Sequence, residues 1–115
     1  MIRTATQDDP GSIRALIQSV AGLWHTEWRP DVLERAIQAA DGLAFVWEEA
    51  GNILGFSCAH DVGFLSYLSL LVVAESARGK GIGRELIIHI NQKVARSSIA
   101  SGSSRMTNPR AALSL

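Results

Sequence analysis

The chain has 115 residues, of which 47% are hydrophobic and 19% charged, and its 11 Lys and Arg residues balance its 11 Asp and Glu residues. This composition predicts one small globular domain and excludes a disordered chain. The net charge of zero argues against nucleic acid or an anionic membrane as a partner, because either would need a broad basic surface.

Targeting and metal-binding patterns are missing from the sequence. No apolar run approaches the roughly 18 residues that span a bilayer, and the N-terminal residues lack the apolar centre of a signal peptide. The single cysteine, Cys58, has no partner for an internal disulfide, and no spacing of Cys and His residues predicts a zinc site. We therefore expect a cytoplasmic protein that binds no metal.

The first half of the chain predicts a strand followed by two helices. Ile2–Thr6 alternates apolar and polar residues, which is typical of a strand. The run Asp-Asp-Pro-Gly-Ser at 8–12 supplies N-cap and first-turn residues for a helix, whose apolar positions continue at helical spacing to Leu23. A loop over 24–29 then leads into a second helix over 30–41.

The second half predicts three strands and a helix. Leu43–Glu49 and Ile53–His60 flank Ala50-Gly51-Asn52, which is the pattern of a β-hairpin. A further strand spans Tyr67–Val73, and a helix with one apolar face begins at Ile82. The order β-α-α-β-β-β-α predicts an α+β domain, with a mostly antiparallel central sheet flanked by helices.

The sequence changes character near residue 96. Small residues follow with little periodicity, Arg105-Met106-Thr107 indicates a stub of strand, and 108–115 has the pattern of the first turns of a helix that is then cut off. We therefore divide the chain into a folded core, residues 1–96, and an irregular or truncated segment, residues 97–115.

A basic glycine-rich turn, residues 78–84, joins the last long strand to the last helix and reads Arg-Gly-Lys-Gly-Ile-Gly-Arg. Its alternating glycines leave backbone N–H groups uncovered at a helix N-terminus, where the peptide dipoles favour negative charge. Arg78, Lys80 and Arg84 add positive charge at the same place. The turn therefore predicts a site for a phosphate or pyrophosphate group.

Other glycine motifs fit this turn less well. A P-loop needs Ser or Thr after its Gly-Lys pair, whereas Lys80 is followed by Gly81. The dinucleotide fingerprint has a different glycine spacing and an acidic residue about 20 positions on, and no acidic residue follows Glu85. A plain glycine-rich turn that only joins strand to helix is the remaining alternative.

The pattern Arg78-x-x-Gly81-x-Gly83, after the lead-in Val73-Ala74-Glu75-Ser76-Ala77, resembles the acetyl-CoA signature of the GCN5-related N-acetyltransferase (GNAT) superfamily. Glu75 stands where proline is common in that family. The resemblance covers roughly residues 1–96, in a C-terminally shortened form. It implies that acetyl-CoA is bound through its pyrophosphate at the turn and through its pantetheine arm at the preceding strand. The residues so implied are Leu71, Val72, Val73, Arg78, Gly79, Lys80, Gly81, Ile82, Gly83, Arg84 and Asn108.

The resemblance also implies acetyl transfer to an amine, with the backbone N–H of Val73 polarising the thioester carbonyl. Family members often carry a catalytic carboxylate about four residues before this valine, where this chain has Ser69 beside Leu70. The usual tyrosine acid would follow Leu115, and Tyr67 does not match its position. The sequence thus departs from the family pattern at both proton carriers.

Other residues are available for proton transfer. Glu27, with His25, lies in the helix–helix loop, and His60 ends a strand beside Asp61, so that we take Glu27 and His60 as candidate catalytic residues. The ordinary alternative for each is a solvated polar residue at the end of an element. For Trp24 and Trp28 an acceptor wall and a core position are both open, whereas Cys58, inside an apolar strand, is expected in the core.

These expectations describe an N-acetyltransferase that moves acetyl from acetyl-CoA to a primary amine of a small molecule or peptide. The alternative is a catalytically impaired acyl-CoA-binding module, or a remnant of the family that forms homodimers. The apolar strand Tyr67–Val73 favours a homodimer, because an exposed strand edge invites pairing with a second chain.

Overall fold

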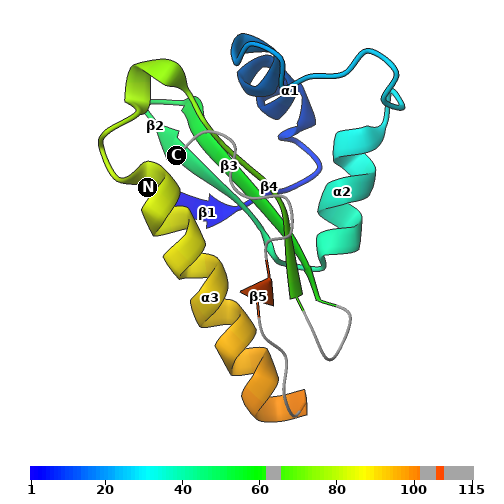
Figure 1. Cartoon of the computed structure of the whole chain (residues 1–115), viewed down its shortest axis with the longest axis vertical. Helices are drawn as coiled ribbons and strands as arrows, with labels where there is room; N and C mark the ends of the chain where they lie inside the picture. Colours follow the sequence, from blue (N-terminus) through cyan, green and yellow to red (C-terminus); the bar gives the residue numbers. More distant parts are fainter. Residues whose placement is uncertain (62–65, 102–105, 108–115) are drawn as a thin grey trace.

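The structure, a computed structural model, describes residues 1–61, 66–101 and 106–107, in which three α-helices pack against a five-stranded sheet (Figure 1). The elements are β1 Ile2–Thr4, α1 Pro10–Ser19, α2 Val32–Ala40, β2 Ala44–Glu49, β3 Asn52–Asp61, β4 Ser66–Val73, α3 Ile82–Ser101 and β5 Met106–Thr107. The strands lie in the order β1-β2-β3-β4-β5, and all neighbours pair antiparallel except β4 and β5, which pair parallel. The predicted α+β class and mostly antiparallel sheet are confirmed.

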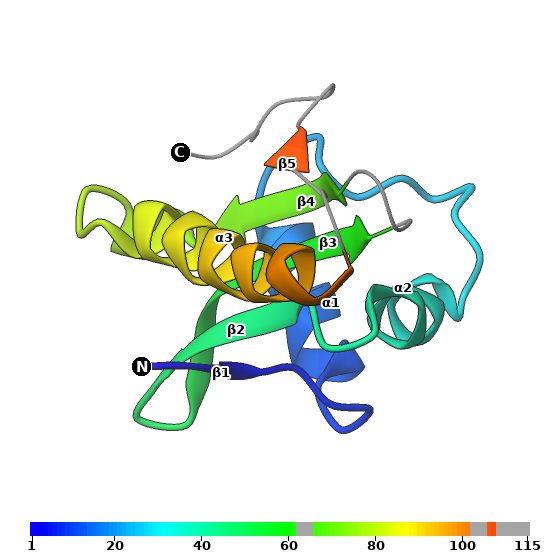
Figure 2. The ribbon, with the colours of Figure 1, turned by 90° about the horizontal axis from the view of Figure 1, so that it is seen from below.

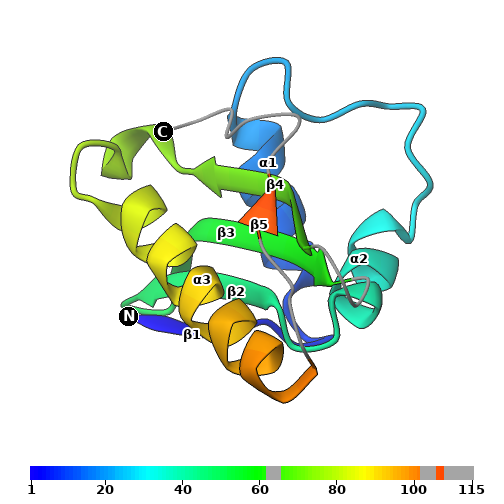
Figure 3. The same ribbon diagram turned by 60° about the horizontal axis from the view of Figure 1, so that its bottom comes forward.

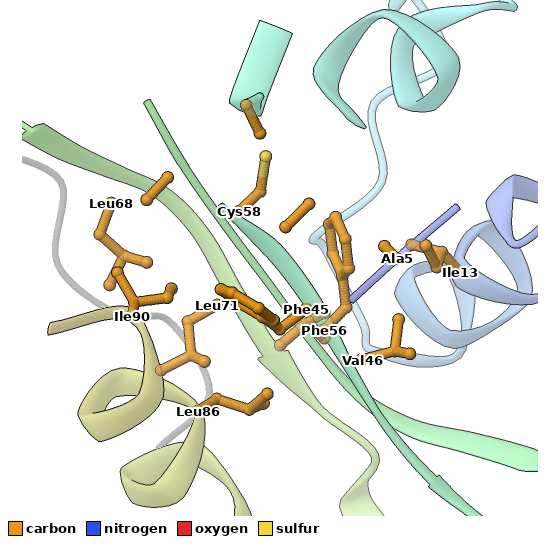
Figure 4. Close-up of a cluster of buried hydrophobic side chains, with 14 of the residues drawn as sticks. Ala5, Ile13, Phe45, Val46, Phe56, Cys58, Leu68, Leu71, Leu86 and Ile90 are labelled. Carbon is orange, nitrogen blue, oxygen red and sulfur yellow. The ribbon is translucent and has the colours of Figure 1, made fainter. Parts of the chain in front are cut away.

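The core has two layers, one on each face of the sheet. α3 covers one face, and α1 and α2 cover the other (Figures 2 and 3). Figure 4 shows Leu71, Leu86 and Ile90 between α3 and the sheet, and Ile13 and Val46 on the other side of the sheet, toward α1. Because alternate side chains of a strand point to opposite faces, a sheet covered on both faces buries consecutive residues.

The helix ends differ from the prediction. α1 ends at Ser19 rather than near Leu23, because Val20 is already extended at ψ 116° and Ser19 Oγ donates to the carbonyl of Leu16 at 2.6 Å. α3 continues to Ser101, into the segment expected to be irregular. Once a helix has begun, each added residue gains one backbone hydrogen bond, so the helix can continue through a stretch without a periodic apolar face.

No helix among the described residues is both long and apolar enough to cross a membrane.

β4 carries one residue more than β3 in the middle of their pairing. Cys58 lies opposite Leu70 and Ala59 opposite Leu68, so that Ser69 is the additional residue of a β-bulge. A bulge bends its strand and redirects the side chains around it. Here it brings Ser69 Oγ to within 3.0 Å of His60 Nδ1 on β3.

Asp9 does not cap α1 as the sequence predicts, because it binds an arginine instead. Its side chain makes no capping hydrogen bond. Both carboxylate oxygens accept from Arg3 on β1, at 2.8 Å each, and one also accepts from the backbone N–H of Thr6 at 2.8 Å. Charge-assisted, bidentate bonds of this kind are stronger than a neutral cap. Arg3 also donates to Glu48 at 3.1 Å, and the cluster therefore joins β1, β2 and the start of α1.

This cluster predicts a pH-dependent contribution to stability. Hydrogen bonds from Arg3 hold the pKa of the Asp9 carboxyl below its ordinary value. The contribution is therefore present above the unfolded-state pKa of about 4 and is lost as pH falls through the lower folded-state value. We expect Asp9→Asn to lower the free energy of unfolding by about 2 kcal/mol at neutral pH, with a smaller difference from wild type at pH 3. Urea denaturation at both pH values measures this, and Asp8→Asn, at an exposed neighbour, is the control. An equal loss at both pH values contradicts the prediction.

Candidate functional site

The glycine-rich turn is held between two buried segments. β4 ends at Val73, a single 3₁₀ turn follows over Glu75–Ala77, and α3 begins at Ile82. Val73, Ala77 and Ile82 are buried. The backbone N–H of Glu85 donates to the carbonyl of Gly81 at 3.0 Å, which makes Gly81 the first residue of the helical hydrogen-bonding pattern. The turn is therefore fixed to the sheet on one side and to the helix on the other.

Glycine is required in this turn for two reasons. Gly79 and Gly81 have φ values of +84° and +80°, which side-chain-bearing residues rarely adopt. A Cβ built on either residue meets no atom within 4 Å, so the space above the backbone is open. The first N–H groups of an α-helix have no acceptor within the helix and carry partial positive charge. An anion thus has access to a polar backbone surface at the start of α3.

A cavity of about 240 Å³ lies over this turn. Buried apolar side chains form its wall, the glycine backbone forms its floor, and two exposed arginines stand at its rim. The residues around it are Val73, Ala77, Arg78, Gly79, Gly81, Ile82, Gly83 and Arg84. An apolar wall beside helix N–H groups and guanidinium groups suits a ligand that joins an aliphatic arm to a phosphate.

The predicted ligand residues are only partly brought together by this cavity. Val73 lies in its wall, but Leu71 and Val72 are buried in the core, and Lys80 is exposed away from the lining. The prediction for Asn108 falls outside the described residues. Ala77 also lines the cavity, although the sequence named it only in the lead-in to the turn and not as a ligand residue.

The backbone N–H groups of β4 point alternately to its two edges. The N–H of Ala74 donates to the carbonyl of Leu54 on β3 at 2.9 Å. Backbone groups of successive residues in an antiparallel strand point to opposite edges. The N–H groups of Leu71 and Val73 therefore point to the edge of β4 that faces away from β3.

The two candidate catalytic residues occupy different surroundings. His60, half-buried near the end of β3, contacts Ser69 through Nδ1 at 3.0 Å and lies with Nε2 3.9 Å from the sulfur of Cys58. Glu27 is exposed in the loop between α1 and α2, and its carboxylate lies 3.5 Å from His25 Nδ1. His60 is therefore set in a hydrogen-bonded group, whereas Glu27 pairs only locally. Among the described residues, no cluster of three or more Cys, His, Asp or Glu side chains is arranged to hold a metal ion.

The aromatic residues of the α1–α2 loop pack against one another. The rings of Trp24 and Trp28 meet edge to face, with centroids 5.2 Å apart, and His25 lies 5.0 Å from Trp28. The guanidinium of Arg14, on α1, stacks over Trp24 at 4.6 Å. Both tryptophans are half-buried, so they brace the loop while leaving part of each ring exposed.

Cys58 is a core residue and not a nucleophile. Its side chain is 2% exposed, and burial raises the pKa of its thiol to about 11. Because the thiolate is the reactive form, we expect modification by a disulfide reagent at pH 8 to be about 100-fold slower in native protein than in urea. Absorbance of the released thiol measures both rates. Equal rates would show that the thiol is accessible in the folded chain.

The sequence profile of the acetyltransferase (GNAT) family matches residues 11–111, which include the turn, the cavity and most of the described fold. The chain belongs to the GNAT acetyltransferase family. The resemblance carried by Arg78, Gly81 and Gly83 is thereby confirmed, and in this GNAT protein the cavity lies over that motif. No curated protein matches the chain in sequence.

Solved GNAT-type structures share this fold. N-acetylglutamate synthase from Neisseria gonorrhoeae, in complex with coenzyme A and N-acetyl-glutamate, superposes with a TM-score of 0.71 at 23% identity, over 94% of this chain and 24% of its own. The ribosomal-protein-S18-alanine N-acetyltransferase of Escherichia coli gives 0.72 at 16% identity, over 86% of this chain and 61% of its own. A ribosomal-protein-alanine N-acetyltransferase from Brucella melitensis gives 0.65 at 26% identity, over 84% and 67% respectively. The chain thus spans less than two thirds of the first two structures.

Proposed function

We propose that this GNAT protein binds acetyl-CoA and transfers the acetyl group to a primary amine of a small molecule or peptide. The observation that carries the proposal is the cavity at the start of α3, where arginines and helix N–H groups adjoin an apolar wall. In the proposed complex, the pyrophosphate of the coenzyme lies on the turn between Arg78 and Arg84. This assignment is supported by the neighbour from N. gonorrhoeae, which was solved with coenzyme A.

The proposal extends to the pantetheine arm and the thioester. The family resemblance implies that β4 holds the pantetheine arm, and the N–H groups of Leu71 and Val73 point to the edge of β4 away from β3. We assign these amides to the arm and to the thioester carbonyl, where a hydrogen bond stabilises the charge that develops on oxygen during acyl transfer. His60 is the candidate base for the acceptor amine, and Glu27 is the second candidate.

A second function is favoured by one observation. Ser69 stands where many relatives carry a carboxylate, and its hydroxyl does not accept a proton at neutral pH. The second candidate is therefore a module that binds acyl-CoA without efficient turnover.

Two measurements separate these functions. Calorimetric titration with acetyl-CoA and with coenzyme A tests binding, and mass spectrometry of a panel of amines and N-terminal peptides tests acetyl transfer. Transfer to an amine supports the transferase, and binding without transfer supports the module. Absence of binding by the intact chain contradicts both.

A further inference from the structure

Ser69 connects two residues of the neighbouring strand at the bulge of β4. Its Oγ lies 2.9 Å from the backbone carbonyl oxygen of Cys58 and 3.0 Å from Nδ1 of His60. Ser69 is exposed and His60 half-buried, so that the pair lies at the surface of the sheet. Ser69 is the unpaired residue of the bulge, so its side chain does not follow the regular alternation of side chains between the two faces of β4.

Counting protons at this hydroxyl determines the state of the histidine. A serine hydroxyl has one hydrogen to donate and two lone pairs to accept with. The Cys58 carbonyl is only an acceptor, so the Ser69 hydrogen is committed to it in this geometry. The contact of 3.0 Å with Nδ1 is then a hydrogen bond only if Nδ1 carries the proton and donates it to Oγ. In neutral His60 the other nitrogen, Nε2, is then left with its lone pair.

We propose that Ser69 is a positioning residue that holds His60 in the Nδ1–H tautomer, so that Nε2 accepts the proton of the acceptor amine. This inference rests on the proposed acetyl transfer. The neutral amine nitrogen forms the new C–N bond to the acetyl carbonyl carbon, and Nε2 takes one proton from that nitrogen as the bond forms. The C–S bond breaks with its electron pair on sulfur, and the proton on Nε2 passes to that thiolate. A serine at the bulge together with an imidazole from β3 thus performs the task of the missing carboxylate.

The groups around His60 leave Nε2 free to act as a base. Cys58, on the same strand, has its sulfur 3.9 Å from Nε2, and this thiol is neutral at pH 7 because burial raises its pKa to about 11. The same sulfur lies 3.7 Å from the carbonyl of Ala36 on α2, which is an acceptor for the thiol proton. Tyr67 pairs with His60 from β4, and Asp61 follows it on β3.

The tautomer is measured directly by NMR. Long-range ¹H–¹⁵N correlation spectra of histidine-labelled protein at about pH 9, where imidazoles are neutral, report which nitrogen carries the proton. His60→Gln assigns the signal. We expect the Nδ1–H form in the wild type and in Ser69→Thr, which keeps the hydroxyl, and the Nε2–H form in Ser69→Ala. The control Ser12→Ala, at an exposed serine on α1, should match the wild type. An Nε2–H wild type, or an unchanged tautomer in Ser69→Ala, overturns the inference.

Kinetics test the consequence of the tautomer. Ser69→Ala should lower kcat/KM for the amine roughly 10- to 100-fold with the KM for acetyl-CoA unchanged, and Ser69→Thr should recover most of the loss. A shifted tautomer with unchanged kcat/KM overturns the role of Ser69. If the wild type shows the Nδ1–H form but acetylates no amine, the proposed transferase has failed instead, and the assignment of Nε2 as a base fails with it.

Discussion

Gly81→Val is expected to abolish measurable binding of acetyl-CoA and to leave the protein folded. Gly81 has a φ of +80°, and valine at this φ either strains the backbone or rotates the peptide groups that face the cavity. Its side chain would also stand in the open space above the turn, where nothing now lies within 4 Å of a Cβ. Both effects remove the approach of a phosphate to the helix N–H groups. We expect affinity to fall at least about 100-fold, which corresponds to roughly 2.7 kcal/mol.

The matched control for this variant is Gly42→Val. Gly42 has a φ of +89° and equally open surroundings, but it lies in the turn between α2 and β2. Each variant should lose about 1–2 kcal/mol of stability from backbone strain, whereas only Gly81→Val should lose binding in calorimetry. Equal affinity of Gly81→Val and wild type would remove the turn from the proposed binding site.

The second large effect is expected at Gly55, on β3 beneath α3. A Cβ at this position would lie 2.9 Å from Ile82 Cγ2, 3.1 Å from Leu86 Cδ1 and 3.4 Å from Trp47 Cβ. Ile82 and Leu86 are buried in the first turns of α3, so these side chains or α3 itself must shift to admit a larger side chain. We expect Gly55→Val to destabilise the protein by about 2–3 kcal/mol, measured by urea denaturation.

The same variant should weaken acetyl-CoA binding at temperatures where it remains folded, because the first residues of α3 also line the cavity. Gly55→Ala should show both effects at smaller size. Gly11→Ala serves as a control in which a Cβ on α1 meets nothing within 4 Å, and it should leave stability unchanged or raise it by up to about 1 kcal/mol. Gly55→Val as stable as wild type would mean that α3 is not fixed by contact with β3.

The fold was predictable because its local signals agree with its tertiary structure. Alternation in β1, the hairpin at Ala50-Gly51-Asn52 and the helical spacing of α3 all indicate the elements that form. Asp9 shows where local reasoning fails: a carboxylate before a helix predicts a cap, yet Arg3, brought close by the folding of β1, competes for it successfully. Helix-capping patterns consider only the residues next to the helix end, so they do not include the competing arginine six residues earlier in the chain.

The site was predictable in part. The turn at 78–84 is a local motif, and the structure places a cavity over its glycines and arginines, whereas the phosphate site that the sequence indicates there stays a prediction. The contact between Ser69 and His60 depends on a bulge that shifts the pairing of β4 against β3 by one residue. Strand register depends on contacts between residues far apart in sequence, so Ser69 was visible in the sequence but its contact with His60 was not.

The buried walls of the cavity make ligand binding part of the folding equilibrium. Val73, Ala77 and Ile82 belong to the hydrophobic core, and the cavity therefore exists only when the sheet and α3 are assembled. A ligand that binds the native chain and not the unfolded one stabilises it by mass action, by about 2.7 kcal/mol at a concentration 100 times its Kd. The thermal midpoint of this protein would then rise with the concentration of any ligand that the cavity binds, so that its stability would depend on the supply of that ligand.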